Sequence, residues 1–139
     1  MRDFSDLLRE DIAAYDGPHL DLLRWVPVLF DLLGSLYEDT RLPRHARLLA
    51  NAALAYFVLP HDLIPESGLG AYGYIDDLYL CAQVLHRLQA EPELDPLLDE
   101  HWGDERALGS VLAEILAKGR IILSDGERAE LLRLTGLET

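Results

Sequence analysis

Apolar residues recur every three or four positions along almost the whole chain, which is the spacing of one face of an α-helix. Phe4, Leu7, Leu8 and Ile12 begin this pattern, and comparable stretches follow towards the C-terminal end. Strand is considered only at Val58 and in the short run 121–123, and neither has a second run to pair with. The pattern therefore predicts an all-α fold, a single compact bundle of about six or seven helices.

Proline, glycine and capping residues divide this pattern into separate helices. Pro27 lies inside a helical stretch, so that helix either kinks there or begins near Val26. Ser124 and Glu127 have the spacing of a capping box at the start of the last helix. After a first helix that includes residues 4–12, the expected helices cover 19–38, 44–59, 74–89, 91–101, 106–118 and 124–134.

Length and composition indicate one domain, residues 1–139, because the chain has 139 residues of which 50% are hydrophobic. A net charge of -13 argues against nucleic acid and anionic lipid surfaces as partners. The longest nearly uncharged run, 48–59, is too short to span a membrane. The single cysteine, Cys81, cannot form an internal disulfide, and the N-terminal residues do not resemble a signal peptide. These features predict a cytoplasmic protein.

The stretch PHDLIPESGLGAYGYIDD, residues 60–77, places four carboxylates between two apolar helices, in a region 48–86 that lacks Lys and Arg. On the helix expected at 74–89, Asp76 shares a polar stripe with Gln83 and Arg87. Asp76 is therefore predicted to face solvent. Asp77 points to the opposite, apolar side of this helix and is predicted to be buried.

A buried Asp77 must be hydrogen-bonded or paired with a charge. If helices 44–59 and 74–89 form an antiparallel hairpin, Arg47 lies about 20 Å from Asp77 along the helix. The remaining candidates are backbone N–H groups of the 61–66 turn and the helix start, Arg24 or Arg120, and a bound cation. First-turn acids are stabilised by the helix dipole, so the sequence favours a structural role. The alternative is a site for Mg²⁺, Ca²⁺ or Mn²⁺, formed by Asp62, Asp76 and Asp77 with Glu66 and His61.

The segment Pro60-His61-Asp62-Leu63-Ile64-Pro65, followed by Gly73 and Asp76-Asp77, resembles the signature of the YkvA-like family of uncharacterised bacterial and archaeal proteins. The resemblance extends over residues 48–88 and includes the apolar helix end 55–59. It implies a family-like core at about 44–89, a helical hairpin with a rigid elbow. The residues that would form this elbow are Pro60, Asp62, Pro65, Gly73, Asp76 and Asp77.

Some members of that family are regarded as membrane-associated. This sequence departs from the family pattern in two places, because Glu66 stands where Asp is common and the loop 67–74 is rich in glycine. The family often has an apolar, proline-containing run in that loop. The second departure weakens the expectation that the elbow contacts a membrane.

The sequence also contains one strongly acidic segment and one basic cluster. Residues 91–105 contain seven acids and no Lys or Arg, which is typical of a solvated face, although the i,i+4 spacing of several acids could also chelate a cation. Trp102 in this segment is predicted to be a packing anchor. A basic cluster is predicted to pair either with this acidic segment or with a partner, and it consists of Arg41, Arg44, His45 and Arg47.

The chain has no phosphate-binding glycine loop, no His-Glu-x-x-His motif and no nucleophile elbow. We therefore assign no catalytic residues and expect no cofactor, although an enzyme is left open. The leading hypothesis is a non-catalytic helical interaction or scaffold module that binds a protein partner or self-associates through apolar faces of its outer helices. One alternative is a divalent-metal-binding protein or enzyme that uses Asp62, Asp76 and Asp77. The second is a peripheral membrane-associated protein without integral insertion.

Overall fold

A computed structural model describes residues 4–15, 17, 19–58 and 74–135 of the chain. The described residues form helices and no strand, which confirms the all-α prediction. Seven helices are longer than one turn, and α2 is a single turn of four residues. The helices are α1 (Phe4–Ala14), α2 (Leu20–Leu23), α3 (Val26–Glu38), α4 (Arg44–Val58), α5 (Ile75–Gln89), α6 (Asp95–His101), α7 (Leu108–Ile122) and α8 (Asp125–Thr135).

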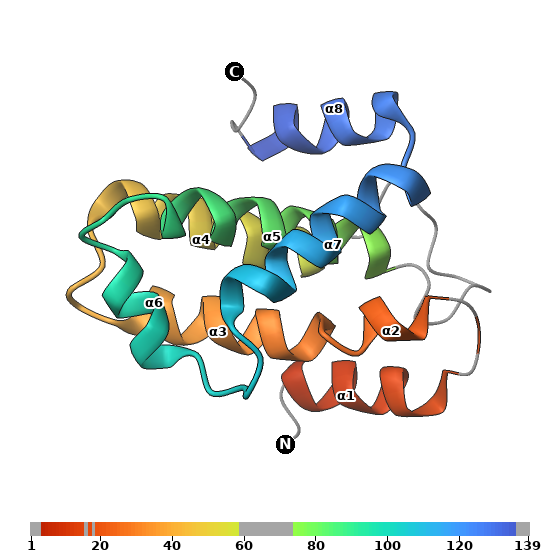
Figure 1. The fold of residues 1–139 in the computed structure, drawn as a ribbon, viewed down its shortest axis with the longest axis horizontal. Coiled ribbons are helices and arrows are strands. Elements are labelled where there is room, and N and C mark those ends of the chain that lie inside the picture. The colour runs from red at the N-terminus through yellow and green to blue at the C-terminus, as the bar shows by residue number, and fades with distance from the viewer. Residues whose placement is uncertain (1–3, 16, 18, 59–73, 136–139) are drawn as a thin grey trace.

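Helix α5 lies at the centre of the bundle, where it contacts α3, α4, α6, α7 and α8 (Figure 1). Residues 75–82 of α5 are all buried, and Val84, Leu85 and Leu88 continue this buried surface. An apolar helix with neighbours on several sides buries residues around most of its circumference. The first turn of α5 is enclosed in the same way, so the polar residues of that turn are buried with the core.

Helices α4 and α5 run antiparallel, as the hairpin prediction requires. Tyr56 near the end of α4 contacts Asp76 at the start of α5, and His45 at the start of α4 contacts Glu91 just after α5 ends. Small side chains recur at helix spacing along the buried face of α4, namely Ala46, Ala50 and Ala53. The other side of α4 is less covered, because Leu54 and Ala55 are only half-buried.

The crossing of α7 over α5 depends on a glycine. A Cβ atom at Gly119 would lie 2.4 Å from Cδ2 of Tyr79, which is far shorter than van der Waals contact. Gly119 is buried, and the Tyr79 side chain is 3% exposed, so neither has free space to move into. The glycine therefore lets α7 approach the aromatic ring on α5 closely.

Several helix boundaries follow the sequence signals. Helix α3 begins at Val26 with Pro27 in its first turn, which decides between a kink and a new helix start. The capping box is confirmed, because the Ser124 N–H donates to Glu127 Oε1 at 2.9 Å and the Glu127 N–H donates to Ser124 Oγ at 3.1 Å. None of the described helices combines the length and the apolarity that a membrane span needs.

Neither place where strand was considered forms one, in agreement with the all-α prediction. Residues 121 and 122 belong to α7 rather than to a strand, and the Leu123 N–H continues the helical bonding by donating to the Gly119 carbonyl at 2.8 Å. Val58 is the last residue of α4. In both places the surrounding helix outweighs the strand preference of β-branched residues.

Candidate functional site

Two consecutive carboxylates lie in the first turn of α5, and both are buried. Asp76 is 0% exposed and Asp77 is 1% exposed. The start of a helix carries unsatisfied N–H groups and the positive end of the helix dipole, and both favour negative side chains there. The position of this pair at the helix start is therefore one reason why two adjacent carboxylates can be buried.

Asp76 joins α5 to α4. The Tyr56 hydroxyl donates to Asp76 Oδ2 at 3.2 Å, and the backbone N–H of Asp77 donates to Asp76 Oδ1 at 2.9 Å. The prediction that Asp76 faces solvent was wrong, because the end of α4 covers the side of α5 on which it lies. Further along the same stripe, Gln83 is half-buried and Arg87 is exposed, so only the first turn departs from the predicted polar stripe.

The prediction that Asp77 is buried on the apolar side of α5 is confirmed. Its effect on the surroundings is seen at Cys81, one helical turn further on. Burial and, secondarily, the negative charge of Asp77 raise the pKa of the Cys81 thiol well above its ordinary value. Cys81 is therefore a neutral buried side chain and part of the core.

The elbow residues Pro60, His61, Asp62, Pro65, Glu66 and Gly73 lie outside the described residues. The proposed metal ligands Asp62, Glu66 and His61, and the backbone N–H groups of the 61–66 turn, therefore stay predictions. The Tyr74 hydroxyl, just before α5, donates to Asp11 Oδ2 at 2.9 Å. This hydrogen bond connects α1 to the start of α5.

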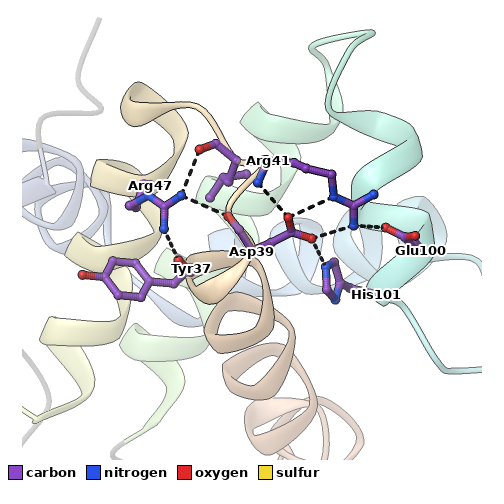
Figure 2. Close-up of polar contacts among 7 residues, drawn as sticks. Tyr37, Asp39, Arg41, Arg47, Glu100 and His101 are labelled. Atoms are coloured by element: carbon purple, nitrogen blue, oxygen red, sulfur yellow. Dashed lines mark hydrogen bonds and ion pairs between the residues drawn. The ribbon is translucent and has the colours of Figure 1, made fainter.

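A second polar cluster, which the sequence did not reveal, is centred on Asp39 at the end of α3. Figure 2 shows the Arg41 guanidinium between the carboxylates of Asp39 and Glu100, with His101 next to the same Asp39 oxygen. Arg41 Nη2 donates to Asp39 Oδ2 at 2.8 Å and also contacts Glu100 Oε2. His101 Nε2 lies 2.8 Å from the same Asp39 oxygen, Oδ2.

The electrostatics of this second cluster are dominated by Asp39, whose side chain is 8% exposed. Hydrogen bonds from Arg41 and then from His101 hold the pKa of Asp39 well below its ordinary value. In return, Asp39 and Glu100 raise the pKa of Arg41. Asp39 and Arg41 therefore carry opposite charges at neutral pH, and the cluster joins the end of α3 to α6.

The predicted pairing of the basic cluster with the acidic segment is confirmed for two of its members. Arg41 contacts Glu100, and His45 Nε2 lies 2.8 Å from Glu91 Oε1. Arg47 has a different role, because its guanidinium donates to the carbonyl oxygens of residues at the end of α3 and in the following turn, namely Tyr37, Asp39 and Leu42 (Figure 2). A cation at the C-terminal end of a helix is favourable.

Trp102 acts as a packing anchor, as predicted. Its ring stacks on Trp25 with a centroid distance of 6.1 Å, and its Nε1 donates to the Arg106 carbonyl at 2.7 Å. Arg24 lies over the Trp25 ring, 4.7 Å from the centroid. The two tryptophans hold the loop after α6 against the start of α3.

Two open clefts lie beside α6. One has a volume of about 350 Å³ and is lined by Arg41, Glu93, Leu94, Pro96, Leu97 and Glu100. The other has a volume of about 280 Å³, and its lining includes Arg9, Asp31, Ser35, His101, Trp102 and Asp104. The Asp39 cluster reaches both clefts, because Arg41 and Glu100 line the first and His101 lines the second.

Comparison with known proteins points to a family without an assigned role. Residues 46–82 match the family described as "Protein of unknown function (DUF1232)". This segment contains most of α4 and the first half of α5, and thus the contact between Tyr56 and Asp76. It ends before α6 and excludes the Asp39 cluster. The finer resemblance to the YkvA-like family stays a prediction.

A curated relative is "Uncharacterized protein ORF9" of Methanothermobacter thermautotrophicus, which is 35% identical over 79 residues. The match covers 57% of this chain and 54% of the relative, so the chain spans about half the length of that protein. No solved structure matches the chain. These similarities support an uncharacterised domain family and assign no activity.

Proposed function

We propose that this chain is a non-catalytic helical interaction module. In this proposal the buried carboxylates at the start of α5 are structural, and the surface around α6 binds a basic segment of a partner protein. Asp76 is 0% exposed and already accepts hydrogen bonds from Tyr56 and from a backbone N–H, which supports a structural role. Residues that act on a substrate need to reach it from a cleft.

The observation that carries the proposal is the acidic face, which we define as Glu93, Asp95, Asp99 and Glu100. Glu93, Asp99 and Glu100 are exposed, and the 350 Å³ groove beside them has an apolar floor of Leu94, Pro96 and Leu97. The lining of this groove also contains Arg41, which pairs with Glu100, but its exposed charges are mainly acidic. Apolar contacts beside charges mainly of one sign are typical of surfaces that select a partner of opposite charge. A segment with leucine-like and lysine-like side chains fits both parts of this groove.

A second copy of the chain fits the acidic face poorly. Each copy has a net charge of -13, so two such faces would repel one another. Large exposed apolar side chains among the described residues are also distributed over different helices, and they are Leu7, Leu20, Tyr37, Leu48 and Ile121. Scattered apolar residues of this kind do not form a docking patch. The distribution of charge therefore favours a basic partner over self-association.

The proposal is tested by fluorescence anisotropy with a labelled amphipathic helical peptide of leucine and lysine. We expect Glu93→Lys combined with Asp99→Lys to weaken binding by about tenfold or more, and binding to weaken as salt is added. The matched control is Asp6→Lys with Glu10→Lys on α1, which changes the net charge equally and should weaken binding by less than about threefold. Equal weakening by both double variants would refute a localised site.

A second candidate function is a divalent cation site formed by Asp62, Asp76 and Asp77, together with Glu66 and His61. The observation that favours it is the burial of Asp76 and Asp77 side by side, because a cation offsets the repulsion between two enclosed carboxylates. Calorimetric titration with Mg²⁺, Ca²⁺ and Mn²⁺ tests it. Binding heat that disappears in Asp77→Asn supports this candidate, and no heat with any of the three ions removes it.

A further inference from the structure

We propose that Asp39, Glu100 and His101 form a binding site for one divalent first-row transition ion of the Zn²⁺ or Fe²⁺ class. This site is separate from the carboxylates of α5 and does not depend on the proposed interaction with a basic partner. One ligand atom from each residue, a carboxylate oxygen or an imidazole nitrogen, lies within 4.8 Å of the other two. One imidazole with two carboxylates is a ligand set that suits such ions.

The position of the ion is indicated by Arg41. Its Nη2 atom contacts both Asp39 Oδ2 and Glu100 Oε2, so a positive charge already occupies the space between the two carboxylates (Figure 2). His101 Nε2 lies 2.8 Å from Asp39 Oδ2, close to the separation of about 3 Å expected for adjacent ligands at 2.0–2.2 Å from an ion. Two of the three ligand atoms therefore need little movement.

Asp39 is held in the orientation that an ion requires. Its Oδ1 accepts the backbone N–H of Arg41 at 2.9 Å and the Arg41 Nε–H at 3.0 Å, while Oδ2 contacts His101 Nε2 and Arg41 Nη2. The backbone hydrogen bond remains when the Arg41 side chain leaves. Hydrogen bonds of this kind to the non-coordinating oxygen orient a carboxylate ligand and increase metal affinity. Glu100, whose side chain is 54% exposed, supplies the adjustable third ligand.

Arg41 has to leave for the ion to bind, and the charge of the ion then takes the place of its guanidinium charge beside Asp39 and Glu100. The Arg41 side chain is 61% exposed, so it can rotate into solvent without a change in the backbone. The pair of Arg41 with Glu100 is exposed on both sides and contributes little to stability. The Asp39 side chain is 8% exposed, so the ion has to replace the positive charge that Arg41 supplies there. Binding requires the Nε2 lone pair of His101, so in the ion-bound state a ring proton has to be on Nδ1.

The clefts on both sides of the cluster leave room for ligands beyond the three side chains. Glu100 lines the 350 Å³ cleft and His101 lines the 280 Å³ cleft. An ion with three protein ligands keeps open positions for water or for a small anionic ligand. The site therefore has the composition of an accessible metal centre.

The test is titration of the full chain, with any affinity tag removed, by Co²⁺ in visible absorption and by Zn²⁺ in calorimetry. We expect saturable one-to-one binding that weakens by about 100-fold or more in His101→Gln. Arg41→Ala should strengthen binding by roughly three- to tenfold, because it removes the competing cation. The matched control is His45→Gln, which removes a histidine from a comparable surface pair with Glu91 and should leave binding unchanged.

Several outcomes would contradict the proposed metal site. Absence of saturable binding to both the wild type and Arg41→Ala would do so, since a purely structural network only loses stability when Arg41 is removed. Binding that persists in His101→Gln and disappears in Asp77→Asn would place the ion at the start of α5 instead. Glu100→Gln gives a second ligand variant in case His101→Gln does not fold, and unchanged binding in Glu100→Gln contradicts the proposal.

Discussion

Asp76→Ala should lower the free energy of unfolding by about 2–3 kcal/mol, because it leaves buried donors without their acceptor. The donors are the Tyr56 hydroxyl and the backbone N–H of Asp77, which now reach the two oxygens of Asp76. Tyr56→Phe should cost less, about 1 kcal/mol, since it removes one neutral donor and leaves the carboxylate bonded to the backbone. Urea unfolding followed by circular dichroism measures both values.

The double variant Tyr56→Phe/Asp76→Ala completes a double-mutant cycle, which measures the coupling energy between the two side chains. If the two side chains stabilise the fold through their mutual hydrogen bond, the double variant should be less destabilised than the sum of the two single variants. A carboxylate that is kept for chemistry is often held at a cost to stability. An Asp76→Ala protein that is as stable as the wild type, or more stable, would therefore contradict the structural role.

Gly119→Ala should destabilise the protein by about 2 kcal/mol, which corresponds to a decrease in melting temperature of roughly 6–8 °C for a domain of this size. The new methyl group would lie 2.4 Å from the Tyr79 ring, so α7 or the ring has to move. Alanine favours helix formation over glycine by about 1 kcal/mol, and the expected loss includes this opposing gain. Differential scanning calorimetry measures the change.

Gly34 provides a matched control, because it also lies within a helix and a Cβ atom at Gly34 meets nothing within 4 Å. Gly34→Ala should therefore stabilise the protein by about 0.5–1 kcal/mol. Opposite signs for the two substitutions would confirm that α7 packs closely on α5 at Gly119. A stabilising Gly119→Ala would show that this contact is looser than described.

The fold was predictable where a local signal specified it. Pro27 allowed either a kink or a helix start near Val26, and the second alternative forms. The Ser124–Glu127 spacing marked the start of α8, because a capping box acts within one turn of helix. The segment 121–123, where strand was considered and set aside, contains no strand. β-Branched residues carry only a weak preference, and α7 continues through residue 122 when its other residues pack on α5.

The candidate sites were predictable only in part. Asp77 was placed correctly because its own helix has an apolar side, but the burial of Asp76 depends on where α4 lies, which the periodicity of α5 does not contain. The Asp39 cluster joins residues 62 positions apart in the chain, Asp39 and His101. No local pattern indicated this cluster, because its contact with α6 comes from tertiary packing.

The acidic face beside α6 is tested most directly by nuclear magnetic resonance of the isotopically labelled chain during titration with the leucine–lysine peptide. If this face is the binding surface, the largest chemical-shift changes should occur at the amides of Glu93, Leu94, Leu97 and Glu100, which line the groove. Amides of α1 and α8 should change little. Changes centred on another helix, or spread evenly over acidic residues throughout the chain, would contradict the proposed function.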